Sequence, residues 1–270
     1  MPKARRFKTR EPGTGTDSGF SLLELLVVAS ILVATSVIAA ATFGGIRRHT
    51  DGRLAHAEMQ EIAAAIRRFK QDTGYYPKTG PFDLETNGGN VPLAALPSYA
   101  GTTDAEKEAW FYSPANFWQL ITTQSPLIDP GSEEGGHPLA KWAPATGRGW
   151  RGPYLSGHRD GYLTIGAGVN SSAPSPAQGE RTGDPGAGDK IHDVAGIADP
   201  FEHSGVGGFL EWSSREWGGR GEGAAPPASH PVWGRPYLVF GWDAAHPTLV
   251  SMGPNGDYEY GDGDDIELEI

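Results

Sequence analysis

The stretch "DSGFSLLELLVVASILVATSVIAAATF", residues 17–43, decides the fold of this 270-residue chain. From Phe20 to Phe43 the run holds 24 residues and is apolar except for a few small hydroxyl side chains and one carboxylate, Glu24. As a helix this run would extend about 36 Å, which is long enough to cross the hydrocarbon core of a bilayer. A carboxylate in the middle of a membrane is unfavourable by roughly 2.5–3.5 kcal/mol, so we expect Glu24 to have a partner of opposite charge.

Charge is divided unevenly along the chain. Residues 1–19 carry five basic and two acidic groups, a balance of +3, whereas the other 251 residues carry 17 basic and 31 acidic groups, a balance of −14. A basic segment beside an apolar span stays in the cytoplasm, which predicts that the acidic C-terminal part lies on the other side of the membrane. Its acidity predicts that nucleic acid is not a partner. The chain has no cysteine, which excludes disulfide bonds and thiolate metal sites.

The basic segment 1–19 does not have the order of a secretory signal peptide, in which the cleavage site follows the apolar core. Here Ser18 and Gly19 precede the apolar run, so cleavage after Gly19 would leave the helix on the mature chain. The segment "GFSLLELLVVASIL" resembles the class III signal of type IV pilins and of type II secretion pseudopilins. The resemblance implies that a prepilin peptidase removes residues 1–19 as a leader and methylates the new N-terminus at Phe20.

The same resemblance gives Glu24 a role in assembly. It implies that Glu24 faces the positively charged N-terminus of a neighbouring subunit in a filament. Inside a helical bundle with little water, such a pair reduces the unfavourable desolvation of both charges and favours one axial stagger. The alternative is a simple signal anchor in which this carboxylate has no function.

The apolar helix is predicted to continue as an amphipathic one through "IRRHTDGRLAHAEMQEIAAAIRRFKQDTGYYP", residues 46–77. Six apolar residues recur at helical spacing and are expected to face a core: Leu54, Ala57, Ile62, Ala65, Ile66 and Phe69. Gly74 is a good helix terminator and Pro77 cannot continue the helix. We therefore predict one helix from Phe20 to about Thr73, with 20–43 in a membrane or filament core and 44–74 packed on a globular head. Many members of the family have a proline where this chain has Ala41, and Gly44-Gly45 is the candidate for a bend instead.

The head, residues 75–270, is predicted to complete an α+β fold in which the long N-terminal helix packs on a small antiparallel sheet with long loop insertions. "DTGYYPKTG" at 72–80, "WRGPYL" at 150–155 and "VWGRPYLVFGWD" at 232–243 resemble segments of major pseudopilins. Alternation and turn residues predict hairpins over 152–165 and 235–253, and residues 105–123 are expected to contain a short helix. The Gly/Pro/Ser-rich segment 156–231 is predicted to be an insertion with a poor core. Its candidates for docking on the domain are Phe201, Phe209, Leu210, Trp212 and Trp217.

The chain ends in the acidic sequence "SMGPNGDYEYGDGDDIELEI", which holds seven acidic and no basic residues from Gly253 to Ile270. Interspersed glycines allow several oxygens to converge, and Ca²⁺ takes about 6–8 oxygen ligands. The spacing is not that of an EF-hand, but it resembles the C-terminal calcium loop of major pseudopilins, predicted here over 251–266. The ligands implied by that resemblance are the Met252 carbonyl, Asn255, Asp262 and Asp264, with Asp257 and Asp265 as helpers. The alternative is a solvated acidic tail.

No zinc-protease, P-loop or nucleophile-elbow motif is present in the sequence, so a structural subunit without enzymatic activity is expected. The resemblance implies a subunit of the type II secretion pseudopilus, held in the bacterial inner membrane by one span with its head in the periplasm. The implied partners are copies of itself, the prepilin peptidase, other pseudopilins, the inner-membrane assembly platform, and membrane lipid before assembly. Alternatives are a type IV pilin for adhesion, motility or DNA uptake, and a minor pseudopilin at the filament tip. A membrane-anchored enzyme or carbohydrate-binding module, built on Trp212, Trp217, Trp233 and Trp242, is the alternative from another class.

Overall fold

The computed structural model describes residues 22–128, 136–155, 162–166, 190–201, 211–213, 234–256, 258 and 261–270. For residues 37–49, 162, 164, 166, 190 and 211–213 it describes the backbone alone. Helices and two small antiparallel sheets make up the described part, so the predicted α+β class is confirmed. Contacts divide the chain into two units, 1–47 and 48–270, which are described separately below.

Helix α1, Leu22–Thr73, is the longest element and carries the deciding stretch of sequence. The helix is continuous through Gly44-Gly45, so the expected bend does not interrupt it. It ends as predicted, because Gly74 adopts a left-handed φ of 89° and its N–H donates to the Lys70 carbonyl at 2.7 Å. Among the described residues, no helix is both long enough and apolar enough to cross a membrane.

The second half of α1 buries a different stripe from the predicted one. Ile62, Ala65, Ile66 and Phe69 are buried as expected, but Leu54 is 46% exposed and Ala57 is exposed too, so the prediction is wrong for these two. The stripe that faces the core recurs every three or four residues and consists of Ala55, Met59, Ile62, Ile66 and Phe69. The stripe is rotated because Met59 belongs to the hydrophobic core of the head, and because Ala55 is fully buried and its carbonyl accepts from the Tyr237 hydroxyl at 3.5 Å.

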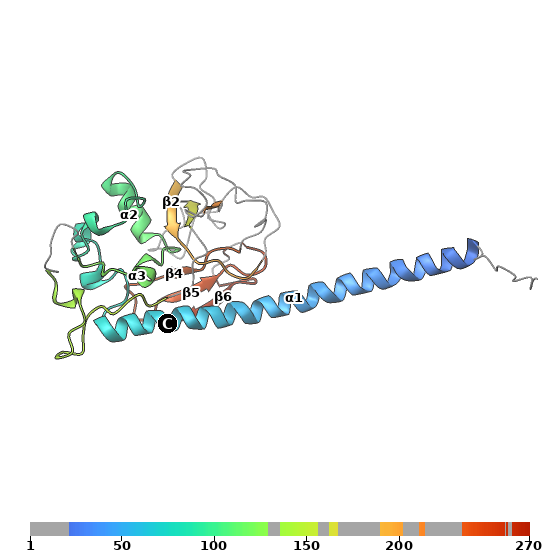
Figure 1. The fold of residues 1–270 in the computed structure, drawn as a ribbon, viewed down its shortest axis with the longest axis horizontal. Helices are drawn as coiled ribbons and strands as arrows, with labels where there is room; N and C mark the ends of the chain where they lie inside the picture. The colour runs from blue at the N-terminus through green and yellow to red at the C-terminus, as the bar shows by residue number, and fades with distance from the viewer. Residues whose placement is uncertain are drawn as a thin grey trace, which may run out of the picture. The chain divides into compact units, whose positions relative to one another are not determined.

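The sheet that covers this stripe is formed by the last third of the head. It contains β4 (Leu238–Phe240), β5 (Thr248–Ser251) and β6 (Ile266–Glu269), all antiparallel in the order β4-β5-β6 (Figure 1). The pairing of β4 with β5 confirms the predicted hairpin over 235–253. At one end of this sheet the Tyr237 hydroxyl donates to Glu58 Oε2 on α1 at 2.8 Å. At the other end the Tyr76 hydroxyl donates to the Ile270 carbonyl at 3.2 Å.

A second sheet lies inside the segment predicted to be a poorly packed insertion. Its strands are β1 (Tyr162–Gly166), β2 (Lys190–Ala195) and β3 (Glu211–Ser213), in the order β2-β1-β3. Leu163, Ile165 and Val194 are buried in the main core, so the prediction of a poor core is wrong for the described part of 156–231. Phe201 is buried as predicted. The side chains of Phe209, Leu210, Trp212 and Trp217 lie outside the described residues.

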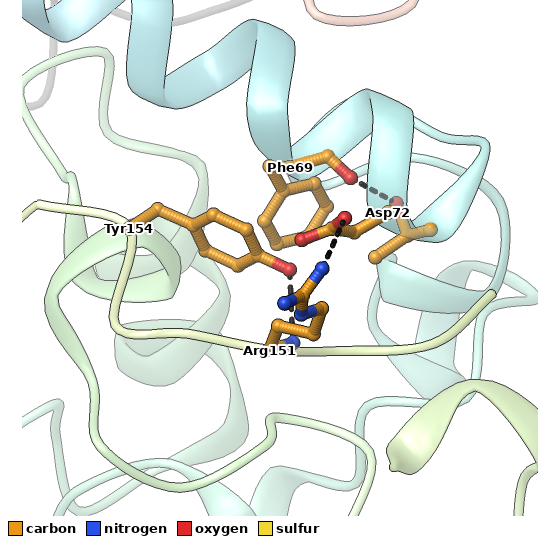
Figure 2. Close-up of polar contacts among 5 residues, drawn as sticks. Phe69, Asp72, Arg151 and Tyr154 are labelled. Atoms are coloured by element: carbon orange, nitrogen blue, oxygen red, sulfur yellow. Dashed lines mark hydrogen bonds and ion pairs between the residues drawn. The ribbon is translucent and has the colours of Figure 1, made fainter. Parts of the chain in front are cut away.

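The predicted hairpin over 152–165 is wrong. Strand β1 pairs with β2 and β3 instead, and the N–H groups of Tyr154 and Leu155 both donate to the Leu120 carbonyl, at 2.8 and 3.0 Å. The "WRGPYL" segment packs on the end of α1, where Phe69 and Tyr154 rings lie 5.2 Å apart (Figure 2). In the same view the Tyr154 hydroxyl accepts from the Arg151 N–H at 3.0 Å.

Short helices connect α1 to the two sheets. They are η1 (Gly80–Phe82), η2 (Glu85–Asn87), η3 (Leu93–Ala95), α2 (Asp104–Tyr112), α3 (Trp118–Ile121) and η4 (Pro138–Ala140). The helix expected within 105–123 is therefore confirmed, and a capping box between Thr103 and Glu106 explains where α2 begins. The Trp110 indole N–H donates to the Asp193 carbonyl at 2.8 Å, which fixes α2 to β2.

Candidate functional site

The first candidate site is the apolar N-terminal part of α1. Its side chains from Leu22 to Ser36 are all exposed, and nine of them are large aliphatic groups with exposed fractions between 45% and 82%. Glu24 lies in the first turn of this helix and is also exposed. The predicted cleavage site between Gly19 and Phe20 lies outside the described residues. An apolar surface of this extent on a single helix needs a cover, either lipid or protein.

The second candidate site is the C-terminal loop that was predicted to bind calcium. Two arms of the loop, 252–256 and 261–265, each contain two glycines in the left-handed region, with φ between 64° and 80°. The arms touch, because a Cβ added to Gly253 would lie 2.1 Å from the Asp264 carbonyl oxygen. Side chains other than hydrogen are therefore excluded at Gly253 both by φ and by the close approach.

Two of the predicted ligands are brought together by these arms. The Asn255 N–H donates to Asp264 Oδ2 at 2.8 Å, and the Gly261 N–H donates to Asp265 Oδ2 at 3.1 Å. Asp262 is exposed, whereas Asp264 and Asp265 are half-buried, and the Met252 side chain is buried at the end of β5. Asp257 lies outside the described residues.

The fit of this loop to calcium is partial. Within the described ranges, no group of three or more histidine or acidic side chains lies close enough to hold a metal. The donors that the two arms do supply are carboxylate, amide and backbone oxygens, which are the ligands that Ca²⁺ takes in proteins. Calcium therefore stays a prediction; the contact between Asn255 and Asp264 is made by the Asn255 backbone N–H, which occupies one oxygen of the Asp264 carboxylate.

A buried carboxyl group that the sequence analysis missed lies beside this loop. Asp199 is 4% exposed and accepts three hydrogen bonds, from the Phe201 N–H at 3.2 Å, the Arg235 N–H at 3.0 Å and the Ser251 hydroxyl at 2.8 Å. Burial raises the pKa of Asp199 to about 8, although the three hydrogen bonds act in the opposite direction. The Ser251 hydroxyl oxygen in turn accepts from the Gly253 N–H at 3.3 Å, so Asp199 connects the segment that follows β2 to the end of β5 and the start of the loop.

A buried lysine is the second polar group that sequence patterns did not reveal. Lys78 is 6% exposed, its ammonium donates to the Ser113 carbonyl at 2.8 Å, and it lies 5.6 Å from the centroid of the Trp242 ring. Desolvation lowers the pKa of Lys78 to about 7. Nothing in "YYPKTG" indicates that Lys78 is buried, because lysine is rarely buried and a loop has no regular period from which its buried side chains can be predicted.

Trp242 cannot contribute to the tryptophan site expected for a carbohydrate-binding module. Trp242 is 6% exposed and belongs to the main core, so its ring faces are not available to stack on a sugar. The side chains of Trp212, Trp217 and Trp233 lie outside the described residues. His137 has a local structural role, since its Nδ1 accepts from the Leu139 N–H at 3.1 Å.

Comparison of the chain with protein-family models, with curated proteins and with solved structures finds no match.

Proposed function

We propose that this chain is a structural subunit of a helically assembled filament, and that the filament is the pseudopilus of a type II secretion system. The observation that carries the proposal is the exposed apolar surface of residues 22–36 on a helix whose other half is built into the core of the head. Removing these nine large aliphatic side chains from water is favourable by on the order of 10 kcal/mol, whether lipid or neighbouring copies cover them. Lipid would cover them in the unassembled chain, and the half-helices of neighbouring copies would cover them in the filament.

Glu24 supports a filament over a simple anchor. In lipid its charge is unfavourable, whereas a bundle of parallel helices can place it beside the α-amino group of Phe20 of a neighbouring copy. The predicted span 20–43 extends beyond the described side chains in both directions. In this proposal the span holds the unassembled chain in the inner membrane, with residues 75–270 in the periplasm.

Processing and partners follow from the same proposal. A prepilin peptidase would cut between Gly19 and Phe20, and the inner-membrane assembly platform and other pseudopilins would add the chain to the filament. The acidic glycine-rich loop at 251–266 and the absence of a cysteine pair favour a pseudopilin over a type IV pilin. Asn255, Asp262 and Asp264, with the Met252 carbonyl, would hold calcium there and tie the two arms of the loop together.

The direct test of processing is mass spectrometry of the chain isolated from native membranes. We expect an N-terminus at methylated Phe20, and an intact Met1 would overturn the assignment. A Gly19→Val variant, which blocks access of the peptidase to the bond before Phe20, provides the unprocessed control. Deletion of the chain should abolish release of secreted proteins; loss of surface motility or DNA uptake with normal secretion would assign the filament to the type IV pili instead.

A further inference from the structure

The buried lysine of the head is held in place at both its backbone and its side chain. Lys78 lies in the loop after α1, with a left-handed φ of 59° that residues with a side chain seldom adopt. Its N–H donates to Gln119 Oε1 at 2.7 Å, and its Nζ donates to the Ser113 carbonyl at 2.8 Å. The packing of the head therefore fixes the position of the Lys78 amine.

No charged group among the described residues compensates this amine. Lys70, near the end of α1, and Asp243, in the turn after β4, are both exposed, and the Tyr112 hydroxyl at the end of α2 donates to Asp83. Desolvation alone therefore sets the direction of the shift and lowers the pKa of Lys78 to about 7. A large share of this amine is neutral at neutral pH, and a neutral lysine amine is a nucleophile.

Two buried donors beside the amine lack an acceptor. Ser113 is 1% exposed and Trp242 is 6% exposed, and neither Ser113 Oγ nor Trp242 Nε1 has a hydrogen-bond partner within the described part of the chain. Both residues already contact the Lys78 side chain, Ser113 through its carbonyl and Trp242 through its ring, whose centroid lies 5.6 Å from Nζ. Buried polar groups are normally paired, so these two donors indicate an acceptor that the polypeptide itself does not supply.

We propose that the Lys78 amine reacts with CO₂ to form a carbamate, whose two oxygens accept from the Ser113 hydroxyl and the Trp242 indole N–H. The amine lone pair attacks the carbon of CO₂ and forms an N–C bond, while one C=O electron pair moves onto oxygen. One amine proton leaves to water, so the product is an anion. The carbamate nitrogen keeps one N–H, which continues to donate to the Ser113 carbonyl. This modification concerns the head alone and does not depend on the proposed filament.

The burial of Lys78 selects a small, uncharged electrophile. At 6% exposure the amine is closed to aldehydes and other larger reagents, whereas CO₂ has three heavy atoms and no charge. An ordinary exposed lysine is almost wholly protonated at neutral pH and has no lone pair with which to react. A water molecule between the same two donors would satisfy them without modifying the amine, and the experiment distinguishes this alternative from the carbamate.

NMR spectroscopy of the full chain in detergent tests the modification directly. The lysines are labelled with ¹⁵N at Nζ, and the protein is equilibrated with ¹³CO₂ at pH 8. A carbamate on lysine gives a carbonyl signal that is split by the bonded ¹⁵N, which neither bicarbonate nor a carbamate on the N-terminal amine gives. We expect one such signal at pH 8 and its loss below about pH 6 at the same CO₂ pressure, because a protonated amine does not react.

Variants assign the signal to this site. Lys78→Met removes the amine and keeps a side chain of similar length, so the signal should disappear. Lys70→Met makes the same substitution at an exposed lysine and should leave the signal unchanged. Trp242→Phe and Ser113→Ala each remove one donor to a charged group, so each should raise the CO₂ pressure for half occupancy about tenfold.

A second measurement uses the melting temperature of the head. At constant pH and ionic strength, CO₂ should raise the melting temperature of the wild type and not that of Lys78→Met, because the carbamate forms in the folded state. A wild type without a ¹⁵N-split signal at pH 8 overturns the proposal and leaves water as the partner of the two donors. Persistence of the signal in Lys78→Met, or unchanged CO₂ affinity in both donor variants, overturns it as well.

Discussion

Replacing Asp199 by asparagine isolates the energetic effect of one buried carboxyl group. Asparagine has nearly the same volume, its Oδ1 can accept from the Phe201 and Arg235 N–H groups, and its amide can donate to the Ser251 hydroxyl. The substitution therefore keeps the three partners of Asp199, reverses the direction of the hydrogen bond with Ser251, and removes the ability to ionise. Any difference in stability that varies with pH then reports the titration of Asp199.

The sign and size of the effect follow from the pKa. Burial raises the pKa of Asp199 from 3.8 to about 8, so the folded head binds this proton more tightly than the unfolded chain. The resulting stabilisation is fully present below about pH 4 and is lost as the pH rises to about 8. A shift of this size corresponds to on the order of 5 kcal/mol, because each pKa unit is worth about 1.4 kcal/mol.

We therefore expect the stability advantage of Asp199→Asn over the wild type to grow by about 1.4 kcal/mol per pH unit between pH 5 and pH 8. The assay is urea unfolding of the processed protein in detergent, followed by tryptophan fluorescence at pH 5, 6, 7 and 8. Lys78, whose pKa is lowered to about 7, titrates equally in both proteins and cancels in the difference. A difference that stays constant over this range would refute the reasoning, since the Asp199 carboxyl group would then keep its ordinary pKa.

Three further predictions concern the loop and the core. Gly253→Ala should lower the free energy of unfolding in urea by about 2–4 kcal/mol, because the new Cβ meets the Asp264 main chain. Gly88 also has a left-handed φ but has open space around it, so Gly88→Ala should lower the same free energy by only about 1 kcal/mol. Equal losses in the two variants would contradict the close approach at Gly253. Met59 is fully buried and Leu54 is 46% exposed, so Met59→Ala should lower the free energy of unfolding by about 2–5 kcal/mol and Leu54→Ala by less than about 0.5 kcal/mol. The reverse order would show that the wrong residues of α1 have been assigned to its buried stripe. Chelation of calcium should lower the melting temperature measured by calorimetry if the loop binds the ion, and identical melting curves in excess calcium and in chelator would exclude the site.

The length of α1 was predictable from the sequence because its signals are local. Apolar residues recur with helical spacing, and Gly74 and Pro77 mark the end. The residues that form the buried stripe are harder to predict, since Leu54 and Ala57 fit the helical period as well as Ala55 and Met59 do. Only the packing of the folded head distinguishes the two sets. The periodicity of apolar residues predicts that a segment is helical more reliably than it predicts which side of the helix is buried.

The second sheet was not predictable because its strands are short and lie far apart in a Gly/Pro-rich segment. Strands β1 and β2 have five and six residues, and their register includes a bulge at Leu163–Ile165. "WRGPYL" was assigned to a hairpin because its composition suits a strand, but its N–H groups bond to the Leu120 carbonyl. Such pairing depends on long-range contacts, which no local pattern contains.

The polar groups near the candidate loop show the same limit. The spacing of Asn255 and Asp264 was visible in the sequence, and the structure brings these two residues together. Asp199 lies more than 50 positions from Ser251, so their 2.8 Å hydrogen bond follows only from the folded arrangement of the sheets. Its position in "GIADPF" gives no sign of burial.

The central claim is that Glu24 drives ordered assembly through a charge on the next copy, and competition between Glu24→Ala and wild-type chains tests it most directly. Both chains are expressed together at equal levels, filaments are sheared from the cells, and mass spectrometry measures the fraction of each chain in the filament. The account predicts that Glu24→Ala is incorporated at least tenfold less than the wild type, although both are cut before Phe20. Equal incorporation of the two chains would contradict it.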